Sequence, residues 1–135
     1  MIYNKDLEIL RSLSCLAKVH KSHAGARICA AVVYKNEIIV VGFNKRKTHP
    51  LMLKFSKNKS RIFLHAEADA IKTGVKYLKE NEMKKSSLYV CRVLKNGAWA
   101  ISKPCEGCMN MIENSEINRI VYSCNGFESY ISLPL

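Results

Sequence analysis

Long hydrophobic runs are missing from this 135-residue sequence. The longest uninterrupted apolar stretch, 28–34, spans seven residues, whereas a transmembrane helix needs about 20. The first residues already include Asp6 and have no apolar core of the signal-peptide kind. Internal repeats, low-complexity tracts and linker-like segments are also absent. These absences predict a single globular domain over residues 1–135, with no membrane partner and a cytoplasmic location.

Acidic residues are scarce. The sequence has 11 Asp and Glu against 22 Lys and Arg, a formal net charge of +11. This excess favours a phosphate-bearing partner, either a nucleotide or a nucleic acid. Much of it lies in the irregular stretch 42–63, which has no acidic residue and seven basic ones: Lys45, Arg46, Lys47, Lys54, Lys57, Lys59 and Arg61. A long irregular segment inside a domain often has a function, although a solvated basic loop would also fit.

Cysteine is not scarce, but a disulfide framework is not indicated. Of the six cysteines, only Cys105 and Cys108 have the spacing of metal ligands. Free cysteine behaves as a small hydrophobic side chain in apolar surroundings, and a cytoplasmic compartment keeps thiols reduced. We therefore expect the other four to be free thiols in helical or β-rich stretches: Cys15, Cys29, Cys91 and Cys124.

The hydrophobic periodicity alternates between helical and strand patterns. Helices are predicted over 4–21, from about 64 or 65 to about 80, and over 105–115. Strands are predicted over 28–34, 37–41, 88–94 and 117–123, with an extension over 99–101 and one further short element in 125–135. This order predicts an α/β fold in which helices sandwich one sheet of at least four strands.

Two short motifs carry potential chemistry: His65-Ala66-Glu67, and Pro104 followed by Cys105 and Cys108. Residues three apart lie on one side of a helix's first turn, and the positive end of the helix dipole there favours thiolate over thiol. His65, at the start of another helix, supplies a nitrogen. Three protein ligands leave a fourth tetrahedral position for water, as in catalytic zinc sites. Zinc lowers the pKa of that water from about 15.7 towards about 7.

Glu67 is predicted to move protons rather than to bind the metal. Side chains two residues apart on a helix point to different sides, yet at the helix start both can reach one cavity. Glu67 could take the proton of the water, pass it to a ring nitrogen and protonate the leaving amine. The combined motif is the signature of hydrolytic zinc deaminases.

Two other interpretations of the cysteine pair are open. A Cys-x-x-Cys pair can be a redox site, although in thioredoxin-like proteins it follows the first strand. A closed structural zinc site would need a fourth ligand from Cys91, Cys124 or His49. Each half motif begins a helix after a predicted strand and loop, and this order favours the catalytic interpretation.

From about residue 28 to 123 the sequence resembles the cytidine and deoxycytidylate deaminase superfamily, most closely its small dCMP-deaminase-like members. The resemblance implies a three-layer α/β/α sandwich with a mixed central sheet of four to five strands. It implies that backbone amides near Ala66 and Cys105 position the base and the attacking water. Gly42-Phe43-Asn44 resembles the family's Gly-x-Asn, in which Asn44 would contact the sugar hydroxyl; a turn role for Asn44 fits equally.

The substrate is expected to be a cytosine-type nucleotide, with dCMP as the best single guess. The basic loop, beginning with Lys45, Arg46 and Lys47, would then grip the phosphate, and the protein is expected to be a homo-oligomer. A deaminase acting on cytosine or adenine in RNA or single-stranded DNA is an alternative, although aromatic residues that could stack bases are few in the loop. A zinc-stabilised nucleic-acid-binding module is a second alternative, and such a module would have no need of Glu67.

Overall fold

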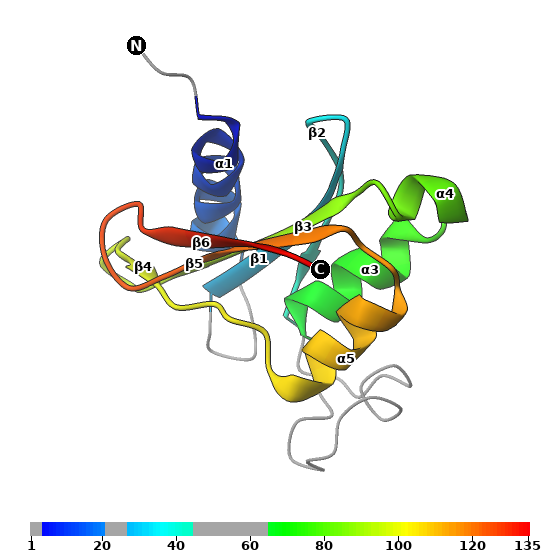
Figure 1. Ribbon diagram of the computed structural model, residues 1–135. Helices are drawn as coiled ribbons and strands as arrows, with labels where there is room; N and C mark the ends of the chain where they lie inside the picture. The colour runs from blue at the N-terminus through cyan, green and yellow to red at the C-terminus, as the bar shows by residue number, and fades with distance from the viewer. Residues whose placement is uncertain (1–3, 21–26, 45–64) are drawn as a thin grey trace.

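One mixed β-sheet organises the chain. The computed structural model describes residues 4–20, 27–44 and 65–135 (Figure 1). Its elements, in chain order, are α1 Lys5–Val19, β1 Arg27–Tyr34, β2 Glu37–Phe43, α3 Ala66–Gly74, α4 Glu80–Met83, β3 Ser87–Val93, β4 Trp99–Ala100, α5 Glu106–Asn114, β5 Arg119–Ser123 and β6 Tyr130–Pro134. No helix within these ranges is long and apolar enough to cross a membrane.

The sheet has the strand order β2-β1-β3-β5-β6, and the two-residue strand β4 pairs with β3. The pair β3 and β5 runs parallel, and the other pairs run antiparallel. The predicted mixed sheet is therefore confirmed, with six strands in the described residues. The added strands are β4 and β6, which form within the predicted extension over 99–101 and the predicted short element in 125–135.

Helices cover both faces of this sheet, as the three-layer prediction requires (Figure 1). Side chains alternate across a strand, and β3 shows the division. Leu88 and Val90 pack with α3 and α5 on one face. Tyr89 and Cys91 pack with α1 on the other. We refer below to the α3/α5 face and the α1 face.

The hairpin between β1 and β2 turns at Lys35 and Asn36. Both residues have positive φ, 51° and 63°, the left-handed backbone that a tight two-residue hairpin requires. The strands pair directly on either side of the turn, from Tyr34 opposite Glu37 to Cys29 opposite Phe43. The predicted hairpin is confirmed, and β2 extends two residues beyond the predicted end.

The second predicted helix is shorter than expected. It was predicted to continue to about residue 80, but α3 ends at Gly74 and α4 is a separate turn of helix. Glycine is a poor residue for continuing a helix, and the chain leaves α3 through i to i−3 hydrogen bonds of Lys76 and Tyr77. Gly74 also lies against β1, where an added Cβ would come 3.2 Å from a Val32 methyl group.

A candidate metal centre at two helix starts

Helix α3 lies directly on β2, and one glycine allows this approach. A Cβ at Gly42 would lie 2.3 Å from the backbone nitrogen of Ala70 and 2.5 Å from the carbonyl oxygen of Ala66. The buried carboxylate of Asp69 adds a link, because its Oδ2 accepts the N–H of Phe43 at 3.1 Å. These contacts fix the amino end of α3, and with it His65, against the end of β2.

The two half motifs meet on the α3/α5 face of the sheet. His65 immediately precedes α3, and Cys105 occupies the corresponding N-cap position of α5, with extended backbone at φ −68° and ψ 170°. No side-chain hydrogen bond caps either helix. Cys108 lies in the first turn of α5 and is fully buried. The predicted third helix is confirmed, with Cys105 as its cap rather than its first residue.

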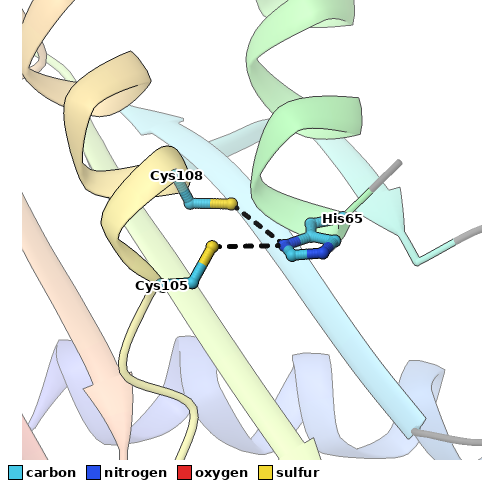
Figure 2. Close-up of side chains that lie close together, drawn as sticks. All are labelled: His65, Cys105 and Cys108. Carbon is cyan, nitrogen blue, oxygen red and sulfur yellow. Dashed lines mark hydrogen bonds between the residues drawn. The ribbon is translucent and has the colours of Figure 1, made fainter. Parts of the chain in front are cut away.

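The three predicted ligands lie together (Figure 2). The Nδ1 atom of His65 lies 3.2 Å from Sγ of Cys108 and 3.6 Å from Sγ of Cys105. All three ligand atoms fall within 4.8 Å of one another. Tetrahedral zinc with Zn–S near 2.3 Å and Zn–N near 2.0–2.1 Å separates such atoms by about 3.5–3.8 Å. The nitrogen and two sulfurs therefore fit zinc in both chemistry and spacing.

A hydrogen bond between the two thiols shifts their pKa values in opposite directions. The pKa of Cys105 is lowered to about 3, chiefly by a hydrogen bond from Cys108 and further by His65, against an opposing effect of burial. The same hydrogen bond, together with burial, raises the pKa of Cys108. Cys105 is therefore the more acidic of the two thiols, and both would be deprotonated when they bind a divalent metal.

Glu67 faces the same cluster from the first turn of α3. It is buried, with 6% of its surface exposed, and it does not belong to the three-residue ligand group. Burial raises the pKa of its carboxyl, and its own backbone N–H and His65 lower the pKa by less. A carboxyl with a raised pKa beside a metal site is suited to accept and return a proton.

A closed structural site would require a fourth protein ligand. Within the described ranges the group contains three residues. Cys91 packs on the α1 face, across the sheet from this cluster. Cys124 packs against the α3/α5 core without joining the group, and His49 lies outside the described residues. Among the described candidates, none closes the site.

The predicted substrate contacts are only partly within the described chain. Ala66 is fully buried as the first residue of α3, and Asn44 is buried immediately after β2. Because Gly42 contacts Ala66, the end of β2 brings Asn44 to the same end of α3 as His65. The predicted phosphate contacts lie outside the described residues: Lys45, Arg46 and Lys47, together with the rest of the basic stretch to residue 63.

Sequence reasoning missed three buried polar side chains near this site. Asp69 ties α3 to β2, and Ser102 and Ser123 are hydrogen-bonded to each other on the path to Cys105. The signal for Asp69 was an acidic residue between two alanines, Ala68 and Ala70, in the predicted helix. The serine pair joins residues 21 apart in sequence, so no local pattern indicates it.

The family model for the cytidine and deoxycytidylate deaminase zinc-binding region matches residues 4–124. The fold and the His-Cys-Cys cluster define a zinc-dependent deaminase domain, and the chain belongs to this family. The predicted family and the predicted zinc cofactor are thereby confirmed. No curated protein matches the sequence closely enough to be counted as a relative.

Solved structures share the fold at low sequence identity. The dCMP deaminase of cyanophage S-TIM5 matches with TM-score 0.59 and 19% identity in its apo form, covering 91% of this chain and 86% of that one. Its complex with dCMP and dUMP matches with TM-score 0.60 and 18% identity, covering 92% and 85%. RibD of Acinetobacter baumannii matches with TM-score 0.53 and 16% identity; the match covers 89% of this chain and 28% of RibD.

Proposed function

We propose that this protein deaminates a cytosine-type nucleotide by hydrolysis, with dCMP converted to dUMP and ammonia. The observation that carries the proposal is the pairing of a buried Glu67 with the three-residue group His65, Cys105 and Cys108. These three residues would hold zinc, which supplies a polarised water of lowered pKa. The single domain over residues 1–135 would contain the whole site.

Glu67 performs the proton transfers in this proposal. Its carboxylate accepts a proton from the attacking water and delivers it to the ring nitrogen next to the carbon under attack. It then carries the second water proton to the exocyclic nitrogen, which leaves as ammonia. The raised pKa of this carboxyl suits both directions of transfer, because a weaker acid holds the proton between the two steps.

Asn44 and the backbone around Ala66 and Cys105 orient the substrate in this proposal. The buried Asn44 amide would bind the sugar, and the N–H groups at the two helix starts would hold the base and the attacking water. Lys45, Arg46 and Lys47 would bind the phosphate, a role supported by the seven basic and no acidic residues of 42–63. One structural neighbour also supports the choice of substrate, since it is a dCMP deaminase in complex with dCMP and dUMP.

The charge of the same stretch favours a second candidate, a polynucleotide substrate. One monophosphate needs two or three cations, and seven could follow a longer phosphate backbone. The monophosphate remains our choice because Phe43, Phe55 and Phe63 are the only Phe, Tyr or Trp side chains there, and single-strand binders usually stack successive bases on such residues.

We also propose a homo-oligomer that acts in a reducing cytoplasm.

Ammonia release from a panel of substrates tests the proposal. Deoxycytidine, cytidine, their monophosphates and a cytosine-containing oligonucleotide should be compared, with zinc-loaded Glu67→Ala as the background control. We expect fastest turnover of dCMP and a shallow salt dependence. Faster turnover of the oligonucleotide, with a slope approaching about 0.7 per phosphate contacted in log affinity against log salt, would favour the second candidate. No release from any compound would contradict both.

A further inference from the structure

The segment that leads to Cys105 enters the sheet where two parallel strands separate. Strands β3 and β5 pair only from Ser87 opposite Arg119 to Val90 opposite Tyr122. Strand β1 occupies the other edge of β3 along its whole length. Strand β4, paired at Ala100 opposite Arg92, therefore takes the place of β5 beside the carboxyl end of β3. Two residues later, Ser102 lies in the fork between β3 and β5.

Beyond the paired residues of β3 and β5, two buried serines supply the hydrogen bonds that join the strands. Ser102 and Ser123 are 8% and 0% exposed, and their hydroxyl oxygens lie 2.8 Å apart. The Ser102 hydroxyl donates to the carbonyl of Val90 at 3.0 Å and accepts the N–H of Ser123 at 3.0 Å. The Ser123 hydroxyl accepts the N–H of Arg92 at 3.0 Å and lies 2.8 Å from the carbonyl oxygen of Ala100. A backbone bond from Ser102 N to Ser123 O, 2.9 Å long, completes the junction.

This junction is the last fixed point before the ligand. Residues 101–105 form neither helix nor strand. Lys103 is exposed, and Pro104 is buried with a φ that its ring restricts. The carbonyl of Cys105 accepts the N–H of Met109 in α5 at 2.9 Å, as the carbonyl of His65 accepts the N–H of Asp69 in α3 at 3.0 Å. Cys105 is therefore held by α5 on its carboxyl side and by the junction at Ser102, three residues earlier, on its amino side.

We propose that Ser102 and Ser123 form a positioning pair for the metal ligand Cys105. Their hydroxyls fix the segment 100–102 between β3 and β5. This restricts the conformations of the segment that follows and keeps the sulfur of Cys105 close to His65 Nδ1. This role rests on the proposed metal site, since it has no meaning unless Cys105 binds the metal. Removing either hydroxyl leaves buried backbone groups without partners, and the segment gains freedom at the point closest to the ligand.

Zinc affinity, measured by chelator competition on purified protein, tests this role. Ser102→Ala and Ser123→Ala should each lower the affinity about 10- to 100-fold, the usual cost of losing a group that orients a metal ligand. The double variant should lose little more than the larger single change, because the two hydroxyls act as a unit. Ser86→Ala is the matched control. Ser86 is fully buried just before β3, at the opposite end of the strand, and its hydroxyl donates to the backbone carbonyl of Glu82 at 2.8 Å. That variant should lose stability but keep the parental zinc affinity.

Parental zinc affinity in Ser102→Ala and Ser123→Ala would overturn the positioning role, and so would an equal loss of affinity in Ser86→Ala. If Ser123→Ala does not fold, Ser102→Ala decides the question alone. His65→Ala separates this role from the metal site itself. Full zinc retention in His65→Ala would refute the site, whereas loss of zinc there with no change in the serine variants would refute only the positioning pair.

Discussion

Two carboxyl groups, one on each face of the sheet, have different surroundings. On the α1 face, Asp6 accepts hydrogen bonds from Tyr89 and from Arg119, whose Nη atoms lie 3.0 and 3.1 Å from the carboxylate oxygens. On the α3/α5 face, Glu67 is buried with a raised carboxyl pKa beside two cysteines and a histidine. A paired carboxylate stabilises the fold, whereas a buried carboxyl with a raised pKa is poised to exchange a proton. In our proposal, the Asp6 cluster on the α1 face therefore contributes stability, and Glu67 on the α3/α5 face contributes to the chemistry.

The largest effect should follow from removing a ligand on the α3/α5 face. Cys105→Ala leaves two ligands, so the protein should lose most of its zinc and essentially all turnover. Elemental analysis of protein purified without chelator measures the zinc, and ammonia release measures the activity. Cys15→Ala is the control, because Cys15 is exposed on α1. This variant should keep the parental zinc content and turnover. Full zinc content in Cys105→Ala would contradict the assigned site.

A smaller effect, on stability alone, should follow from a change on the α1 face. Arg119→Ala removes the guanidinium that links Asp6 to Tyr89, and the partly exposed cluster limits the expected loss to about 1–2 kcal/mol of unfolding free energy. Zinc content and kcat should remain at the parental level. Denaturant unfolding gives the stability, with Arg11→Ala as the control for an exposed ion pair. A large fall in zinc content in Arg119→Ala would break the division between the two faces.

Acid should weaken the same cluster by protonating the carboxylate of Asp6. Burial raises the pKa of Asp6, but hydrogen bonds from Arg119 and Tyr89 outweigh burial and hold the pKa below 3.8. A depressed folded-state pKa contributes stability above the unfolded-state value, and this contribution is lost as the pH falls through the folded-state value. The stability difference between the parent and Asp6→Asn should therefore shrink below about pH 4. A difference that does not change with pH would show that the carboxylate charge contributes nothing.

The smallest consequences should come from the thiols that bind no metal. Cys29 and Cys91 lie opposite each other on β1 and β3, both fully buried, and burial raises the pKa of each to about 12. Native alkylation at neutral pH should modify the exposed Cys15 and spare these two until the protein unfolds. Mass spectrometry of the alkylated protein identifies the modified cysteines. A disulfide between Cys29 and Cys91 would contradict the expectation of free thiols in a reducing compartment.

The zinc-deaminase signature predicted the ligand cluster, and hydrophobic periodicity predicted helices that sandwich one sheet. Local signals place His65, Cys105 and Cys108 at two helix starts, but the signature was needed to predict that the two starts meet. The end of α3 at Gly74 was missed because apolar spacing continues to Leu78 after the helix itself stops. Strand β6 was only suggested as a short element, because it is an edge strand whose residues are mostly exposed. The Ser102 and Ser123 junction depends on a contact between distant segments, and no pattern in either segment reports it.

Zinc content and turnover of Glu67→Ala, measured on the same preparation, test the central claim most directly. Glu67 lies beside the ligand group without belonging to it, so the variant should fold and retain about one zinc per chain. Its turnover should fall by at least about 10²- to 10⁴-fold, the usual contribution of a general acid–base group. Loss of zinc would place Glu67 among the ligands. Full turnover with zinc retained would contradict its role as the proton carrier.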